Sequence, residues 1–433
     1  MTTVTAPSRL WRTPRYLTWL VSDTSKGLAA ALFAFAIPLL ALIVTDDPAQ
    51  AGIIGAAGVV ARLLTTLAGG ILADRHSRTA LMLVGSIAGI VLAGVFTALA
   101  LWGTLTFMSL LLFNILLAAR SGLFDVAGES AIKEIVPDDR MGRAQAANQG
   151  RDAALQLAGG PLGGLLLGVG GWLVGVAMTL CHGIAAVTAW MLGRALPRQE
   201  AGDDADAGVD SGPAPDAPAR NAWREMREGF AWLLSRPDLG GVLLIITIIN
   251  LGFNAAITTV IYALQQDGYP ELLIGAMSSG IGVTMLVGAF IAPLLVPRIG
   301  AGVLAITALC VVAAGAVALS AVTAPWAIVA VLGAAVLLLP ALNAGMMGYF
   351  MVATPTHLLG RANSAAGVLG MGAMPLAPLI AGFGLTTLGR EGTILVCAAL
   401  CLIAVVLAVS NRALRGLPVE SQWAAHAKTY EMR

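Results

Sequence analysis

Eight ionisable residues stand inside long apolar segments of the sequence, where a charge is costly and is by default functional. They are Asp23, Lys26, Arg62, Arg120, Asp125, Glu129, Arg151 and Asp152. Four are acidic, four are basic, and all of them lie in the first half of the chain. A carboxylate near cations can gain or lose a proton when burial or its neighbours change. The pattern therefore predicts proton or charge chemistry in the first half.

Asp23 and Lys26 are three residues apart, so on a helix they share one face and can pair. Two interpretations remain open for this pair. Either it is a static ion pair, or Asp23 alternates between pairing and protonation. Arg120 and Asp152 complete the predicted proton-coupling group, with a structural alternative in which Arg120 only anchors Asp152 or Asp23.

The second half of the chain has no charge at comparable depth, so we expect it to supply mainly shape and apolar contact. Arg62 is predicted to face a substrate cavity and attract an anionic group. The predicted cavity residues of the second half are Asn250, Asn254, Asn343, Met347 and Phe350. For Met347 and Phe350 the alternative is ordinary packing, whereas in a cavity such flexible side chains suit varied apolar ligands.

Helices that cross a membrane must position these residues. Of the 433 residues, 58% are hydrophobic and 11% are charged, against about 25% charged in a typical soluble domain. A membrane-spanning helix needs about 20 mostly apolar residues. The predicted fold is an all-α membrane protein with twelve transmembrane helices, at residues 16–44, 50–73, 79–101, 105–131, 143–168, 171–193, 239–265, 271–296, 300–322, 326–353, 361–387 and 391–412.

The distribution of basic residues predicts the topology. Twenty of the 25 lysines and arginines fall in segments on the side of the N-terminus, one falls in an opposite loop, and four lie inside spans. Both termini are therefore predicted to be cytoplasmic. The expected domains are a six-helix bundle at 1–193, a cytoplasmic linker at 194–238, a second six-helix bundle at 239–412 and a cytoplasmic tail at 413–433.

The linker combines two kinds of sequence. Gly202 to Ala219 is rich in Asp, Ala, Gly and Pro and is predicted to be disordered. Residues 223–234 alternate apolar and charged side chains at helical spacing, which predicts an amphipathic helix on the membrane surface.

The two halves repeat each other. The pattern Pro-x4-Gly-Arg-Ala occurs at 137–144 and again at 355–362, and Gly164 falls on Gly382 at the same offset. Two six-helix halves in parallel repeat are a known transporter architecture, with substrate sites near the membrane midplane between the halves.

Three motifs carry a family resemblance. The hairpin Gly70-Ile71-Leu72-Ala73-Asp74-Arg75-His76-Ser77-Arg78-Thr79 resembles the G-x-L-A-D-R-x-G-R-K/R loop of the major facilitator superfamily, with departures at Ser77 and Thr79. Residues 131–137 and 143–148 are similar to the enterobactin-exporter and macrolide-efflux branch. Gly160-Pro161-Leu162-Gly163-Gly164 resembles the antiporter motif of exporters, although Gln156 stands where that motif has an upstream Gly.

The resemblance implies roles for these motifs. Gly70, Asp74, Arg75 and Arg78 would form a cytoplasmic gate with Asp125 and Glu129, in which Asp74 also meets the N-terminus of helix 11. The alternative is a solvated loop whose charges only set topology. Gly160, Pro161 and Gly164 would seal helix 5 against its neighbour, a role that close packing of small residues explains equally well. Arg120 resembles the helix-4 arginine that antiporters of the superfamily associate with proton coupling.

The predicted function is export of a small amphipathic or hydrophobic compound (a drug, secondary metabolite or siderophore) by proton antiport with alternating access. The alternatives are a proton-coupled importer of a solute such as a sugar or organic acid, and a non-transporting sensor or scaffold. No nucleotide-binding loop, metal-ligand spacing or nucleophile motif stands where a site could form. We therefore expect no enzyme activity, metal or cofactor beyond a proton gradient. The expected partners are a small-molecule substrate and the lipid bilayer but no nucleic acid, for a monomer in the cell membrane.

Overall fold

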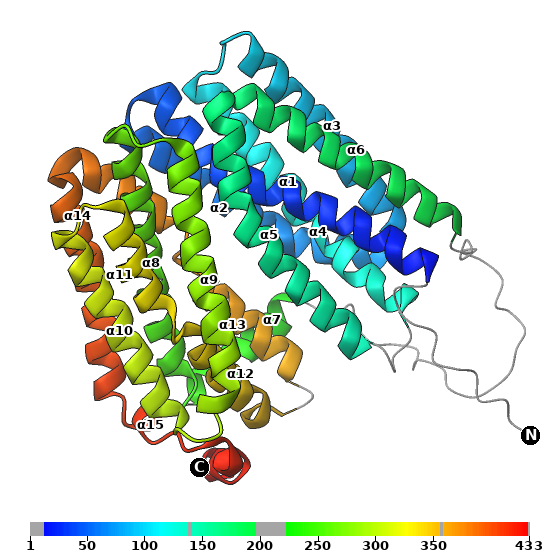
Figure 1. The fold of residues 1–433 in the computed structure, drawn as a ribbon. Coiled ribbons are helices and arrows are strands. Elements are labelled where there is room, and N and C mark those ends of the chain that lie inside the picture. Colours follow the sequence, from blue (N-terminus) through cyan, green and yellow to red (C-terminus); the bar gives the residue numbers. More distant parts are fainter. Residues whose placement is uncertain (1–12, 137–140, 196–221, 237, 356–357, 432–433) are drawn as a thin grey trace, which may run out of the picture.

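The computed structural model describes residues 13–136, 141–195, 222–236, 238–355 and 358–431. The predicted disordered segment, Gly202 to Ala219, lies outside these residues. The side chains of Asp74 and Arg143 are outside the description as well. The chain forms two bundles of long helices side by side, one coloured blue to green and the other yellow-green to red (Figure 1).

The first bundle contains six long helices. They are α1 (Pro14–Thr45), α2 (Pro48–Arg75), α3 (Arg78–Leu101), α4 (Phe107–Ile135), α5 (Met141–Val169) and α6 (Gly171–Ala195). Their ends follow local rules of helix capping. Asp47 accepts a hydrogen bond from the Ala49 amide and is followed by Pro48 at the first helical position. Thr106 and Ser109 form a capping box at the start of α4.

The second bundle repeats the arrangement with broken helices. Its elements are α8 (Gly240–Gln266), α9 (Glu271–Leu295), α10 (Ala301–Ala321), α11 (Pro325–Val336), α12 (Leu339–Ala353), α13 (Leu359–Gly372) and α14 (Leu376–Ser410). The predicted spans 326–353 and 361–387 are each interrupted, the first at residues 337–338 and the second at 373–375. Proline stands at both breaks: Pro340 comes shortly after the first, and Pro375 is the last residue of the second. Proline lacks the backbone N–H that a continuous helix would use for hydrogen bonding.

Eleven helices among the described residues are long and apolar enough to cross a membrane. The sequence predicts twelve, and the difference arises at Gly389. Residues 361–410 count as one segment, but Gly389 has φ 70° inside α14. The chain turns back there, because Gly384 before the turn faces the side chain of Thr393 after it. The exact number of membrane crossings stays a prediction.

The amphipathic linker helix differs from its predicted placement. It forms α7 (Ala222–Ser235), as expected, but it packs against the protein. Gly229 lies against the backbone of Arg361 in α13, and Leu233 is fully buried in the core. Part of the apolar face that the sequence assigns to the membrane surface therefore packs on the protein, whereas Leu234 is exposed. After α14 come α15 (Arg412–Arg415), η3 (Glu420–Gln422) and α16 (Trp423–Glu431), and Trp423 packs on Gly348 of α12.

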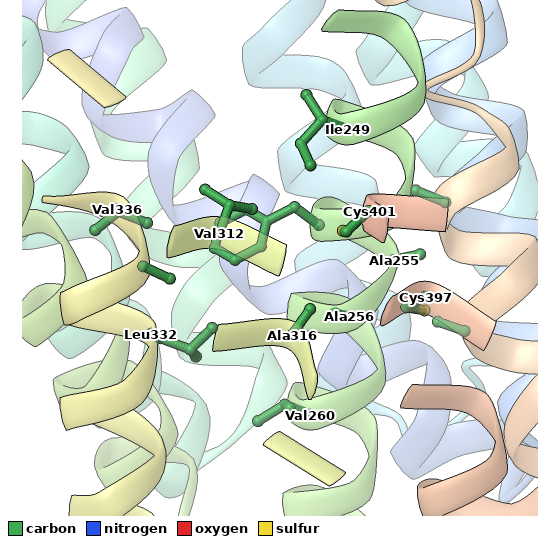
Figure 2. Packing of buried hydrophobic residues seen from close by; sticks show 14 of the residues in the cluster. Ile249, Ala255, Ala256, Val260, Val312, Ala316, Leu332, Val336, Cys397 and Cys401 are labelled. Carbon is green, nitrogen blue, oxygen red and sulfur yellow. The ribbon is translucent and has the colours of Figure 1, made fainter. Parts of the chain in front are cut away.

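The core of the second bundle is apolar. Ile249 and Val260 of α8 face Val312 of α10 and Leu332 of α11, with Cys401 of α14 beside them (Figure 2). The first bundle packs similar side chains around α1, α3, α4 and α6. Part of its interior carries charges instead.

The two bundles contact each other at one end through pairs of small residues. In the first pair of helices, Gly160 of α5 lies on the backbone of Gly275 of α9, and Gly164 lies on Glu271. In the second pair, Gly382 of α14 lies on the backbone of Pro48 and Gly52 of α2. This end carries the start of α2 and the end of α5, opposite to the hairpin at 75–78. The bundles are therefore closed at one end of the molecule.

Candidate functional site

A network of ion pairs joins α1, α4 and α5 inside the first bundle. Lys26 Nζ lies 3.1 Å from Asp23 Oδ1 and 3.9 Å from Asp125 Oδ1. Arg151 Nη1 lies 2.8 Å from Asp23 Oδ2, and Arg120 Nη2 lies 3.3 Å from Asp125 Oδ1. Asp23 thus stands between cations of two helices, and Asp125 does the same.

Helix geometry explains part of this network. Asp23 and Lys26 share a face of α1, as their spacing predicts. Ser121 stands one turn before Asp125 on α4 and donates its hydroxyl hydrogen to that carboxylate. The remaining pairs depend on how α1, α4 and α5 pack together. Trp19 of α1 helps to set this packing, because its indole donates to the Gly128 carbonyl of α4 and its ring lies 5.7 Å from the Arg151 guanidinium.

The network lines a cavity of about 720 Å³, which we call the outer cavity. Its charged lining comprises Asp23, Lys26, Arg62, Asp125, Glu129, Arg151 and Asp152. Four acids and three bases therefore face one volume. Glu129 is exposed in it and has no ion pair or hydrogen bond with any residue that the structure describes.

A second, smaller volume adjoins the first. This inner chamber of about 270 Å³ is bounded mainly by α1, α2, α4 and α6, with Pro378 of α14 as a contribution from the other bundle. Phe33, Ile37, Leu117 and Met178 give it an apolar wall. The two volumes share Ala30, Ala34, Arg62 and Ser121 in their linings, so an apolar chamber stands directly beside a charged cavity.

The predicted proton-coupling residues come together only in part. Asp23 and Lys26 pair as expected. Arg120 is buried, but it pairs with Asp125 rather than with Asp152 or Asp23. Asp152 is half exposed and pairs with its neighbour Arg151 at 2.8 Å.

Two of the predicted gate residues face the same volume as Asp23. Asp125 and Glu129 both line the outer cavity. Arg75 is exposed, and Arg78 donates to the Ser130 carbonyl at 3.0 Å, which ties the hairpin to α4. Gly70 has open space around it, and the side chain of Asp74 lies outside the described residues. The predicted contact of Asp74 with the N-terminus of α13 stays a prediction.

The helix-5 motif packs closely, as predicted. Gly160 and Gly164 have no room for a side chain, because the backbone of α9 lies against them. Ser279 of α9 also donates a hydrogen bond to the Leu157 carbonyl of α5. Pro161 lies between the two glycines inside the helix. The neighbour of this motif is the other bundle, so the contact closes one end of the molecule.

The predicted cavity residues of the second half line neither volume. Asn254 donates to the Asn250 carbonyl within α8, and both side chains are half buried. Asn343 and Met347 are exposed on α12, whereas Phe350 is 8% exposed and belongs to the core. Arg62 of α2 does line both volumes, as predicted.

Sequence reasoning missed two participants. Arg151 stood among the ionisable residues of the spans but was not selected, although it pairs with Asp23. An Arg-Asp dipeptide inside a span was the available signal. His182 of α6 lines the inner chamber and is 2% exposed. A single histidine in an apolar helix offered no signal of its position.

A family comparison now identifies the fold. The model of the Major Facilitator Superfamily matches residues 24–378. The chain belongs to the major facilitator superfamily. It is therefore a multi-pass membrane transporter, and no curated protein sequence matches it significantly. The described residues contain no group of three or more His, Cys, Asp or Glu side chains that could hold a metal ion.

Solved structures of other superfamily members share the architecture. A bacterial homologue of the iron transporter ferroportin, in an inward-facing state, is 15% identical with a TM-score of 0.68, covering 91% of this chain and 97% of its own. A bacterial homologue of the human lysosomal transporter Spinster, inward-facing and unoccupied, is 14% identical with a TM-score of 0.63, at 96% and 98% coverage. A mutant form of the nucleoside transporter NupG is 11% identical with a TM-score of 0.66, at 91% and 100% coverage. At these identities the likeness concerns the fold alone.

Proposed function

We propose that this transporter exports a small amphipathic compound from the cytoplasm in exchange for protons, as a monomer in the cell membrane. The observation that carries the proposal is the position of Asp23. It is paired with Lys26 of its own helix and with Arg151 of α5, in a cavity that adjoins an apolar chamber. A membrane-embedded carboxylate in such a position is the usual candidate for a proton carrier.

Ion-pair exchange provides the coupling. A proton on Asp23 removes its negative charge and releases Arg151 and Lys26 from their partner. Because Arg151 belongs to α5 and Asp23 to α1, protonation weakens one contact between these helices. Helix α5 also carries the glycines that contact α9 at the closed end. Protonation and opening of that end therefore act on the same helix, which is what alternating access requires.

The distribution of basic residues indicates which side of the membrane this conformation faces. The hairpin with Arg75 and Arg78 is on the side that the distribution of basic residues assigns to the cytoplasm. The glycine contacts close the opposite end, so this conformation corresponds to a cytoplasm-facing state. Asp23 is ion-paired in it, which fits a carrier that has released its proton to the cytoplasm and is ready for substrate.

Proteoliposomes with an imposed pH gradient test the proposal. A panel of lipophilic and amphipathic compounds is added outside vesicles with an acidic lumen, and accumulation is compared with protein-free vesicles. Proton antiport predicts accumulation in vesicles with an acidic lumen, irrespective of the orientation of the protein. Accumulation only when the outside is acidic would establish symport instead and would overturn the proposal.

Asp23→Asn is the decisive variant. It keeps the side-chain shape but cannot exchange a proton, so we expect loss of gradient-driven accumulation. Asp267→Asn is the matched control, because Asp267 is an exposed residue at the end of α8. Gradient-driven accumulation by Asp23→Asn at the rate of the unmodified protein would remove Asp23 from the mechanism.

A further inference from the structure

The inner chamber has a charge distribution that proton coupling leaves unexplained. The described residues of its lining include Arg62, Arg120 and His182 but no Asp or Glu. The carboxylates of the site all line the outer cavity. Cationic groups thus stand at an apolar chamber without an acid in its wall.

Arg120 is buried with part of its hydrogen-bonding capacity unused. Its Nη1 donates to the Gly85 carbonyl at 3.1 Å, and its Nη2 contacts Asp125 at 3.3 Å. Its Nε has no hydrogen-bond partner among the described residues, although the side chain is only 6% exposed. A buried guanidinium N–H without an acceptor is costly, so a ligand that supplies an acceptor gains affinity there.

A second arginine on the same lining has capacity for a ligand. Arg62 is exposed toward both volumes, and no described carboxylate lies within ion-pair distance of it. A planar guanidinium matches a carboxylate with two parallel N–H···O bonds.

The residues shared by the linings of the two volumes form the border between them, and Arg62 is the charged residue among them. Arg120 beside this border is paired with Asp125, whereas Arg62 has no described carboxylate within ion-pair distance. A ligand with one carboxylate supplies the anionic partner that Arg62 lacks.

We propose that the inner chamber and its border bind the anionic end of the substrate, and that the exported compound is an amphipathic monocarboxylate. Its carboxylate contacts Arg62 and the Nε of Arg120, and its apolar body lies against Phe33, Ile37, Leu117 and Met178. This inference deepens the proposed function and rests on it for the direction of transport.

The size of the chamber narrows the substrate class. A cavity of about 150 Å³ is enough for benzene, and the inner chamber measures about 270 Å³. It therefore accommodates one substituted aromatic ring or a short branched alkyl group. Larger compounds would extend into the outer cavity.

Binding in the absence of any gradient tests the inference. A series of 4-alkylbenzoates and the matching 4-alkylbenzamides is titrated into the full-length protein in nanodiscs by calorimetry. A charge-assisted hydrogen bond contributes enough for about a tenfold or larger difference in affinity. We expect the benzoates to bind at least tenfold more tightly than the uncharged amides, and equal affinity would overturn the inference.

Arg62→Gln is the first variant, because an exposed cavity side chain is replaceable without loss of folding. We expect a loss of benzoate affinity of about tenfold or more and no change for benzamide, with partial recovery in Arg62→Lys. Arg298→Gln, at an exposed position after α9, is the matched control. Unchanged benzoate affinity in Arg62→Gln would exclude the subsite.

The two proposals fail separately. If benzoates bind selectively but no compound accumulates in acidic vesicles, the anion subsite stands and proton antiport is wrong. If uncharged compounds accumulate in acidic vesicles and benzoates do not bind, proton antiport stands and the monocarboxylate inference is wrong.

Discussion

The two bundles share one architecture but bury different groups. In the first, Asp23, Lys26, Arg120 and Arg151 form ion pairs around a cavity. In the second, the described interior between α8, α10, α11 and α14 is apolar (Figure 2). Its ion pairs, Arg236–Asp238 and Arg361–Glu228, lie at the end where α7 packs.

The difference in buried groups suggests different roles for the two bundles in transport. A buried ion pair adds little net stability compared with apolar side chains of similar volume. The described interior of the second bundle is apolar, so this helix arrangement does not by itself require ion pairs at its centre. We infer that the first bundle carries out the exchange chemistry and that the second supplies a surface against which the first one moves.

The interface between the bundles differs from their interiors, because both bundles contribute glycines to it from corresponding helices. Gly160 with Gly275 and Gly382 with Gly52 are contacts between corresponding helices of the two repeats. The sequence repeat places Gly164 and Gly382 at equivalent positions. The two repeats are thus alike at the interface between the bundles and differ in their interiors, where, among the described residues, only the first bundle has the network of buried charges.

The largest expected effect on the balance between conformations comes from filling one symmetric contact. Gly275→Leu inserts a side chain where the Gly160 backbone lies, and overpacking costs about 1–3 kcal/mol. The cost applies only to the state with this end closed, so that state becomes about 5–150-fold less populated. Labelling of Ala34→Cys in the cavity by a membrane-impermeant thiol reagent measures the population. Gly94→Leu is the control, because no atom of the described residues lies within 4 Å of a Cβ built there.

The next prediction compares a buried charge with a buried apolar residue. Arg120→Ala leaves Asp125 without its closest cation and is expected to cost about 3–5 kcal/mol. Leu332→Ala in the second bundle is expected to cost about 2–5 kcal/mol. Both should lower the unfolding temperature in detergent, whereas only Arg120→Ala should abolish proton-coupled accumulation. Loss of coupling in both variants would contradict the division between the bundles.

A smaller effect concerns the ion pair next to α8. Burial opposes ionisation of Asp238, but hydrogen bonds from Arg236 and Tyr349 outweigh it and hold the pKa of Asp238 below its ordinary value of 3.8. A lowered pKa in the folded state stabilises the protein above the unfolded-state value, and this stability is lost as pH falls through the folded value. The unfolding-temperature difference between the unmodified protein and Asp238→Asn should be constant near neutral pH and shrink below about pH 4. A difference that grows on acidification would refute this role.

The smallest expected effect comes from the linker helix. Glu228 pairs with Arg361 of α13 at 2.8 Å, and both side chains are partly exposed. Such a pair contributes about 0–1 kcal/mol, so Glu228→Gln should change the unfolding temperature and transport rate very little. A large drop in transport would mean that α7 controls the movement of α13, and that the second bundle takes part in more than packing.

The sequence alone predicted a membrane protein of long apolar helices, the repeat and the Asp23–Lys26 pair. These features depend on neighbours along the chain, because hydrophobicity over about 20 residues decides insertion and helical spacing decides which side chains share a face. The same reasoning predicted close packing of Gly160 and Gly164, since small residues in a span are there to let backbones approach.

Only the tertiary structure decided the partners of the charges. The pairs of Arg151 with Asp23 and of Asp125 with Arg120 follow from the rotation and packing of α1, α4 and α5. The packing of α7 on α13 was equally hidden, because an amphipathic helix covers any apolar surface and its sequence does not distinguish protein from lipid. Local patterns specify which face of a helix is polar, and the neighbour that meets this face is set by contacts between residues distant in the chain.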